Sequence, residues 1–479
     1  TAVRDSVLVK LPDFPPKGAK PDPRELRRGR VGIRPGEKLD LLYLARRISL
    51  FTDSCPEIGE LPFPPLGRVA AQPYLHGLFL KKPNLLQFFV KELSTLAKSG
   101  SDEAREDFFR WCSPCKNPES ELALTFPYDP GLLYEGEWEA KVKELGRVGA
   151  TEQLAGVQKL NGLLLRIREE MGGTTPIPYY ALVEMDGDGV GHGLRGKDQR
   201  QWEAAIKQLD AFSDAAAREI EKAEGVPFYA AADELLFYVP VDKALDAVTK
   251  LSTLWDRTVG STVLSGTTLS GGVVIVHVKD DLTLARDAAG KALKAAKKAR
   301  RQAAQGASES LRDTGAAPPP WLRVEEHPRA GSPRAVTGPL PSLVEQLRCW
   351  AQDRGATAGE PGSAEESLSL RTAHILHEHL LRFQPLNEDS LSRREPGMPM
   401  IGRGEQLIDP EVWIARGAIL RQLASNEDRA GGEEDPTGPR GRLRRRVLNL
   451  QHPGDVEALL NELLIAARIG RVAAQRESQ

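Results

Sequence analysis

The order of strands and helices in the middle of the chain constrains its fold more than any other feature. The hydrophobic patterns predict, in order, a strand, a helix, a β-hairpin, a second helix and a strand, over residues 179–185, 198–224, 227–239, 241–257 and 269–278. A basic helix at 282–303 follows. The order β-α-β-β-α-β is that of a ferredoxin-like α+β domain. We therefore expect two helices on one face of the sheet, with the other face free for a ligand or another domain.

Acidic residues stand at two bends of this predicted sheet. The first strand runs into Asp186-Gly187-Asp188-Gly189, and the hairpin bends at Asp233-Glu234. If the strands pair, the two bends lie side by side at one edge. Nucleotidyl transfer needs carboxylates that hold two divalent ions about 4 Å apart. Asp186 and Asp233 are therefore candidate ligands of Mg²⁺ or Mn²⁺, with Glu234 and Asp188 as supporting acids. The alternative is that acids in glycine-rich turns are ordinary solvated turn formers.

Length and composition set the wider limits. A chain of 479 residues predicts about three domains at roughly 150 residues each. Its net charge is −2, so any contact with nucleic acid must come from local basic patches. No apolar run approaches the roughly 20 residues of a membrane helix, and no signal-peptide pattern opens the chain. The 4 cysteines argue against a disulfide scaffold and fit a reducing cytoplasm, where we expect the protein.

Composition and periodicity divide the chain into five predicted parts. They are an N-terminal arm or linker rich in proline, a helical domain, a palm domain, a linker rich in Ala, Gly, Ser and Pro, and a C-terminal helical domain, at residues 1–36, 37–175, 176–303, 304–340 and 341–479. Within the last part, helical patterns lie at 343–352 and 453–469.

The first helical part contains a pair of cysteines at the spacing of a zinc knuckle. Cys112 and Cys115 enclose two residues, but no second pair of this kind lies nearby. Two reduced thiols in a turn are therefore the alternative to a zinc site, and zinc is doubtful. A group of histidines, His374, His377 and His379, lies on one predicted helix without a carboxylate partner and is interpreted as structural.

Several stretches of the predicted palm resemble a known family, the large palm-domain subunit of type III CRISPR effector complexes in its Cmr form. The stretches that carry the resemblance are Pro178–Asp188, Tyr229–Glu234, Leu269–His277 and Lys291–Lys297. The resemblance is strong over about 176–300 and weaker in the two helical parts. It implies partners in the other effector subunits of the backbone and small types, in CRISPR RNA and in target RNA. Many members make cyclic oligoadenylates from ATP, and many carry an N-terminal HD nuclease domain.

The resemblance also implies roles for individual residues. Asp186, Asp233 and Glu234 would be catalytic with Mg²⁺ or Mn²⁺. ATP would be bound by residues of the two acidic bends, the third strand and the closing helix, namely Gly187, Asp188, Gly189, Ala231, Ala232, Ser270, Lys294 and Lys297. In the family a lysine of the closing helix reaches the triphosphate.

The sequence departs from the family pattern in three places. It contains no His-Asp nuclease motif, so we expect no DNA cleavage by this chain. The Gly-Gly-Asp-Asp turn of the family is replaced by Ala231-Ala232-Asp233-Glu234. Alanine in a left-handed conformation costs about 1 kcal/mol or more, and its methyl group can block a base or ribose. Where the family has its first pair of zinc ligands, this chain has Asp40 and Tyr43.

These departures favour a structural and regulatory large subunit of a ribonucleoprotein that recognises target RNA in antiviral defence, with an impaired palm. The retained acids support the alternative of a Mg-dependent cyclic oligoadenylate synthase activated by target RNA. A third alternative is a free-standing regulatory domain similar to a nucleotide cyclase.

Two basic stretches are candidate contacts for RNA. The first lies along the closing helix of the palm and comprises Lys291, Lys294, Lys297, Lys298, Arg300 and Arg301. The second opens a later helix and comprises Arg440, Arg442, Arg444, Arg445 and Arg446. Either stretch could equally be a solvated helix face. If they touch RNA, they should bind phosphate without sequence preference.

Overall fold

The computed structural model describes the palm and much of its surroundings. The described residues are 66–98, 126, 128, 130–134, 151–261, 264–306, 318–329, 331–355, 416–417, 419–420, 439–450 and 453–476. The predicted N-terminal arm, Cys112, Cys115 and the histidine group at 374–379 lie outside these ranges. None of the helices in the described ranges is long and apolar enough to span a bilayer.

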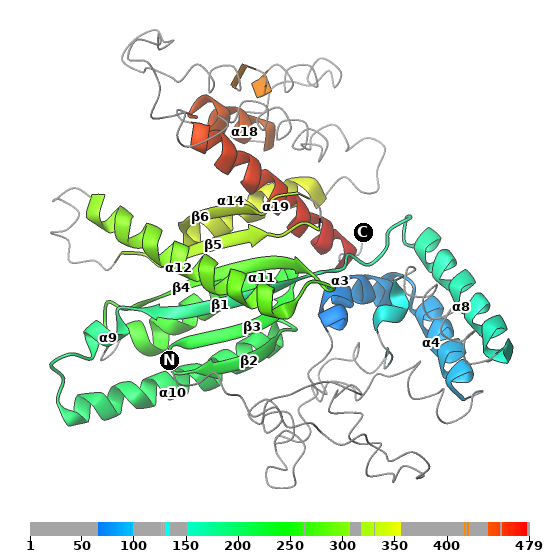
Figure 1. Ribbon diagram of the computed structural model, residues 1–479, viewed down its shortest axis with the longest axis horizontal. Helices are drawn as coiled ribbons and strands as arrows, with labels where there is room; N and C mark the ends of the chain where they lie inside the picture. Colours follow the sequence, from blue (N-terminus) through cyan, green and yellow to red (C-terminus); the bar gives the residue numbers. More distant parts are fainter. Residues whose placement is uncertain are drawn as a thin grey trace, which may run out of the picture. The chain divides into compact units, whose positions relative to one another are not determined.

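A six-stranded sheet organises the described structure (Figure 1). Its strands, in spatial order, are β2 (Val226–Ala231), β3 (Glu234–Pro240), β1 (Tyr179–Asp188), β4 (Thr268–His277), β5 (Trp321–Glu326) and β6 (Arg334–Pro339). All neighbours are antiparallel except β4 and β5, which are parallel. The long helix α12 (Leu282–Gly306) connects those two strands, as a parallel pair requires.

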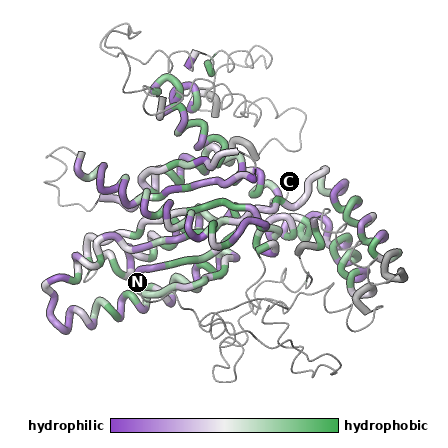
Figure 2. Tube along the Cα trace, viewed as in Figure 1, coloured by the Kyte–Doolittle hydropathy of each residue, from purple (hydrophilic) through white to green (hydrophobic). Residues whose placement is uncertain are grey.

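The first four strands confirm the predicted ferredoxin-like order. Helix α10 (Gln199–Lys222) connects β1 to β2, and α11 (Val241–Trp255) connects β3 to β4. Asp198 begins α10 with a capping box, because its side chain accepts from the Gln201 N–H at 2.9 Å while the Gln201 side chain accepts from the Asp198 N–H. Hydrophilic and hydrophobic colours alternate along α10 in Figure 2. This is the pattern of an amphipathic helix with one buried face.

The predicted linker contains two strands of the sheet. Residues 304–340 were expected to form a spacer, but β5 and β6 extend the palm sheet from four strands to six. Leu322 and Val324 are fully buried, and they alternate with the more polar Arg323 and Glu325. The alternation covers only six residues between prolines and glycines, so it is too short to stand out in the sequence. Its pairing with β4 supplies the stability that the local pattern lacks.

Both faces of the sheet are covered, including the one expected to be free for a ligand or for another domain. Helices α10 and α11 pack on the face that carries Val183 and Phe237. The opposite face carries Tyr180 and Leu182, and α12 packs on it together with α3 (Leu66–Lys81). The α12 residues in this second core are alanines.

The described C-terminal helices share the palm's core. Helices α14 (Leu340–Gly355), α18 (Pro439–Leu448) and α19 (Pro453–Arg476) contribute side chains to the same buried cluster as α10 and α11. The described part of the predicted C-terminal domain therefore has no separate core from the palm.

A third core lies among the N-terminal helices, where the sequence predicts a helical region. It contains residues of α3, α4 (Pro83–Lys98) and α8 (Thr151–Glu170), together with the short turn at Pro130–Leu133. Figure 2 shows hydrophobic residues recurring along α4 and α8.

One arginine near the end of α19 ties that helix to the palm. Arg476 Nη1 and Nη2 donate to the two carboxylate oxygens of Glu224 at 2.6 and 2.9 Å, and Nε donates to Asp242 at 2.5 Å. Glu224 has φ 60, a left-handed backbone that non-glycine residues rarely adopt. The Asp242 side chain is only 4% exposed, so its charge depends on this partner. Arg476 therefore binds the residues on both sides of the β2–β3 hairpin, Glu224 before β2 and Asp242 after β3.

We expect Arg476→Met to lower the free energy of unfolding by about 3 kcal/mol, because it leaves Asp242 as a buried charge without its partner. Denaturant unfolding followed by circular dichroism measures this loss. The control Lys222→Met breaks an exposed pair with Glu219 and should change the free energy by less than about 0.5 kcal/mol. Equal losses in both variants would show that the buried arrangement contributes nothing special.

Candidate nucleotide and metal site

The first acidic segment lies within a strand and not in a turn. Strand β1 continues to Asp188, three residues beyond its predicted end. Asp186 is paired with Ser270 of β4 on one side and with Glu234 of β3 on the other. Directly paired residues of antiparallel strands point to the same face, so these three side chains share one face of the sheet. It is the face on which α12 packs.

The second acidic segment closes the β2–β3 hairpin beside the first. Ala231 and Glu234 are the last paired residues, so Ala232 and Asp233 form a two-residue turn. The backbone oxygen of Asp233 accepts from the Gly187 N–H at 3.1 Å. The structure thus brings Asp186, Asp233 and Glu234 to the same end of the sheet.

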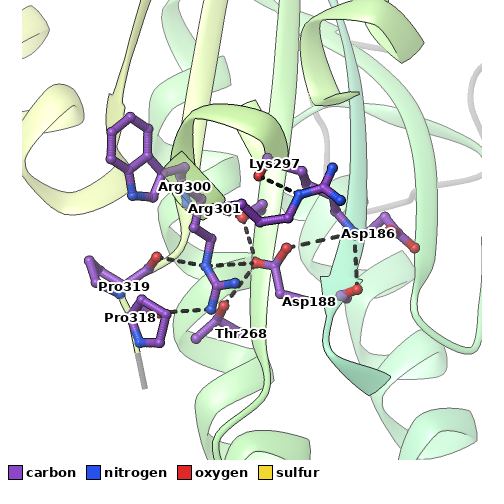
Figure 3. A network of polar contacts seen from close by, with 11 residues as sticks. Asp186, Asp188, Thr268, Lys297, Arg300, Arg301, Pro318 and Pro319 are labelled. Carbon is purple, nitrogen blue, oxygen red and sulfur yellow. Dashed lines mark hydrogen bonds and ion pairs between the residues drawn. The ribbon is translucent and has the colours of Figure 1, made fainter. Parts of the chain in front are cut away.

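Asp188 is held in the interior of this end. Its side chain is 5% exposed. One carboxylate oxygen accepts from the hydroxyl groups of Thr268 at 2.8 Å and Ser270 at 2.5 Å (Figure 3). Arg300 Nε lies 3.6 Å from the same oxygen. The buried carboxylate of Asp188 thus links β1 to β4 and to α12.

Lys297 points from α12 to the acids and does not belong to a solvated helix face. Its ammonium group donates to the Asp186 carboxylate and, at 3.0 Å, to the backbone oxygen of Gly187 (Figure 3). Nζ also lies 3.7 Å from Asp188. The neighbouring Lys294 and Lys298 are exposed. The predicted basic stretch therefore has two parts, one exposed and one that neutralises the acids.

Arg300, which the sequence predicted only as a contact for RNA, joins this site to the strand that follows α12. Its guanidinium donates to the backbone oxygens of Pro318 at 2.9 Å and Pro319 at 3.0 Å (Figure 3). The Trp321 N–H at the start of β5 donates to Ser270 Oγ at 3.0 Å. The spacing of three between Lys297 and Arg300 places both on one side of the helix and was the available signal.

Burial and neighbouring charges affect the acids unequally. Partial burial raises the pKa of Asp233, and the nearby Asp186 carboxylate raises that pKa further. Glu184, which was not among the predicted site residues, is half-buried and lies two residues before Asp186 in β1. Burial raises the pKa of Glu184, while Arg286 opposes the rise. The face of β1 that packs against α12 thus carries acids, and basic side chains of α12 lie close enough to offset their charge.

Comparison with known proteins places this geometry in a family. A model described as Cas10/Cmr2, second palm domain, matches residues 179–305. Over these residues the chain is similar to the second palm domain of Cas10/Cmr2 proteins. The resemblance predicted from the sequence is confirmed over this region.

Relatives of the palm are found among curated and solved proteins. The CRISPR system Cmr subunit Cmr2 of Pyrococcus furiosus is 29% identical over 190 residues, which cover 33% of this chain and 22% of that protein. Chains of the type III-B Cmr-beta complex are similar in its apo state (TM-score 0.41, 13% identity, 83% of this chain and 50% of that one) and bound to cognate target RNA (TM-score 0.43, 12% identity, 78% and 48%). This chain therefore spans half or less of the length of these relatives.

Two positions beside the acids, 187 and 189, require glycine for different physical reasons. A Cβ on Gly187 would lie 2.6 Å from Val190 Cγ2 and 2.9 Å from the Trp255 ring, so packing excludes a side chain there. Gly189 has φ 80 and open space around it, so its backbone conformation favours glycine. Packing therefore requires glycine at position 187, and the contact of Gly187 with a nucleotide stays a prediction.

The palm's hairpin turn contains the strained alanine that the sequence predicts. Ala232 has φ 51. Its neighbour Ala231 lies in β2 with extended backbone and is exposed. Only one of the two replaced glycines therefore falls at a left-handed position. Ala231 and Ala232 remain predicted, not demonstrated, contacts of a nucleotide.

The donor atoms do not fit a two-metal centre as they are arranged. Oxygen ligands from Asp186, Asp233 and Glu234 are the type that Mg²⁺ prefers. Within the described ranges, however, no group of three or more His, Cys, Asp and Glu side chains could hold a metal ion. Two oxygens that a metal would use, on Asp186 and Gly187, already contact Lys297. A zinc site at Cys112 and Cys115 lies outside the described residues.

We expect Ala232→Gly to stabilise the palm by up to about 1 kcal/mol, because glycine adopts positive φ without the steric cost that alanine carries. Thermal unfolding measures the change. The matched control is Ala231→Gly, one residue earlier in a strand, which should destabilise by about 0.5–1 kcal/mol. The same sign in both variants would contradict the assignment of strain to Ala232.

Proposed function

We propose that this chain is the structural and regulatory large subunit of a type III CRISPR effector, a ribonucleoprotein of the cytoplasm that recognises target RNA through a guide RNA in antiviral defence. The observation that carries the proposal is the Cas10/Cmr2-type palm at residues 179–305, on a sheet with the expected strand order. The similarity to a protein named CRISPR system Cmr subunit Cmr2 supports the same assignment.

The proposal includes a palm that does not make nucleotide messengers. Three features support it. The turn that carries glycines in the family has a methyl group on a left-handed Ala232. Asp188 is buried among hydroxyl groups and Arg300. Finally, Lys297 contacts the carboxylate of Asp186, which a metal would need as a ligand. Each feature reduces access of a triphosphate or its metal to the acids.

The proposed RNA contacts are the exposed basic residues of α12. Lys291, Lys294, Lys298 and Arg301 are exposed along this helix, whereas Lys297 and Arg300 are half-buried. Exposed cations are free to approach phosphate, and binding of this kind weakens steeply as salt rises. In the C-terminal stretch, Arg446 instead pairs with Glu462 at 3.3 Å. The α12 stretch is therefore the stronger candidate.

The decisive activity test uses the complete effector assembled with this chain. With target RNA, ATP and Mg²⁺ or Mn²⁺, we expect no cyclic or linear oligoadenylate above the level of an effector that carries Asp186→Ala. Chromatography of the nucleotide products measures this. Product that disappears with Asp186→Ala would replace the proposal with its alternative, a metal-dependent cyclic oligoadenylate synthase.

Assembly is tested separately by co-expression with the other effector subunits and a CRISPR array. We expect the purified chain to carry those subunits and short RNA of uniform length, as resolved on a denaturing gel. A chain that purifies alone and free of RNA would contradict the effector role, and would favour a free-standing regulatory domain.

A further inference from the structure

The ammonium group of Lys297 lies among oxygen atoms of the kind that bind divalent cations. It contacts an Asp186 carboxylate oxygen and the Gly187 backbone oxygen, and lies 3.7 Å from Asp188. A carboxylate and the carbonyl of the next residue are oxygen donors that suit a hard cation. Because Nζ donates to both, a metal ion could bind these oxygens only by displacing the lysine.

The lysine is held in this position by the helix that carries it. Ala289, Ala292 and Ala296 of α12 are fully buried against the sheet. Arg300, one turn after Lys297, is fixed by the backbone oxygens of Pro318 and Pro319. Lys297 itself is 20% exposed. Lys297 is thus screened from water on most sides, and the fixed helix holds it beside the acids.

We infer that Lys297 is the resident cation of this palm and replaces a divalent metal at Asp186. The site is complete with an internal charge, so it does not take up Mg²⁺ or Mn²⁺. This inference rests on the proposed function, because it treats the palm as non-catalytic, and it adds the physical cause. The inference gives Lys297 a different role from the exposed lysines of α12, because Lys297 contacts the oxygens of Asp186 and Gly187 that a metal would use.

The test is a Mn²⁺ titration of the full chain, followed by electron paramagnetic resonance of the free ion. The wild-type chain should show no Mn²⁺ binding that depends on Asp186. Lys297→Met should gain one Mn²⁺ site at least about tenfold tighter than any in the wild type. The substitution removes a positive charge that repels Mn²⁺ and frees the oxygens that the ammonium group contacts. Adding Asp186→Asn to that variant should abolish the new site.

Lys298→Met is the matched control, since it removes an adjacent exposed charge from the same helix. It should leave Mn²⁺ binding as in the wild type. Gain of the same site in this variant would mean that general charge controls binding, and would overturn the inference.

Three other results would overturn it. One is a Mn²⁺ site in the wild type that disappears with Asp186→Asn. Another is a folded Lys297→Met chain, and a folded Lys297→Gln chain, that gain no site. If both variants are destabilised, Mn²⁺ should raise their melting temperatures towards that of the wild type. The third result is that Mn²⁺ fails to do so. The titration uses neither RNA nor partner subunits, so its failure is distinct from a failure of the effector assignment.

Discussion

The close approach of α12 to β4 is the contact on which the described palm depends. A Cβ on Gly272 would lie 2.5 Å from the backbone nitrogen of Leu293 and 2.8 Å from the backbone oxygen of Ala289. The helix presents alanines to the sheet at this crossing. Glycine on the strand and alanine on the helix bring the two backbones together. Lys297, on the inner side of α12, is thereby placed within reach of Asp186 in β1.

This spacing explains why the charged end of the palm is self-contained. The acids of β1 and the basic residues of α12 meet across a short gap, and the hydroxyl groups of Thr268 and Ser270 complete the shell of Asp188. Burial would make isolated carboxylates costly. The structure offsets this cost with its own cations and hydroxyl groups, so the acidic cluster carries its own counter-charges.

The sequence predicted the four central strands and their helices because their periodicity is long and regular. It predicted the adjacency of the two acidic segments, since the strand order leaves few alternatives. Strands β5 and β6 were missed because they are short and depend on pairing with β4. The extension of β1 through Asp186–Asp188 was missed for a similar reason, because glycines in a strand give no local signal.

The direction of the lysines was the hardest feature to predict. Helical spacing places Lys291, Lys294 and either Lys297 or Lys298 on a common side, but it does not tell which of the last two meets the acids. That choice follows from where α12 crosses the sheet. The pairing of Arg476 with Glu224 spans 252 residues and leaves no trace in local pattern. Tertiary contacts of this length are invisible to propensity and periodicity.

The link between the end of α19 and the start of the palm has a consequence for synthesis of the protein. Gln475 accepts from the Ile177 N–H at 3.3 Å and donates to the Thr175 oxygen at 2.6 Å, across a sequence separation of 300 residues for the second contact. The segment that leads into β1 is thus secured by almost the last described residues. On the ribosome, the palm strands emerge long before this partner exists. The last contacts of the palm therefore form only after residues 300 positions later in the chain have been synthesised.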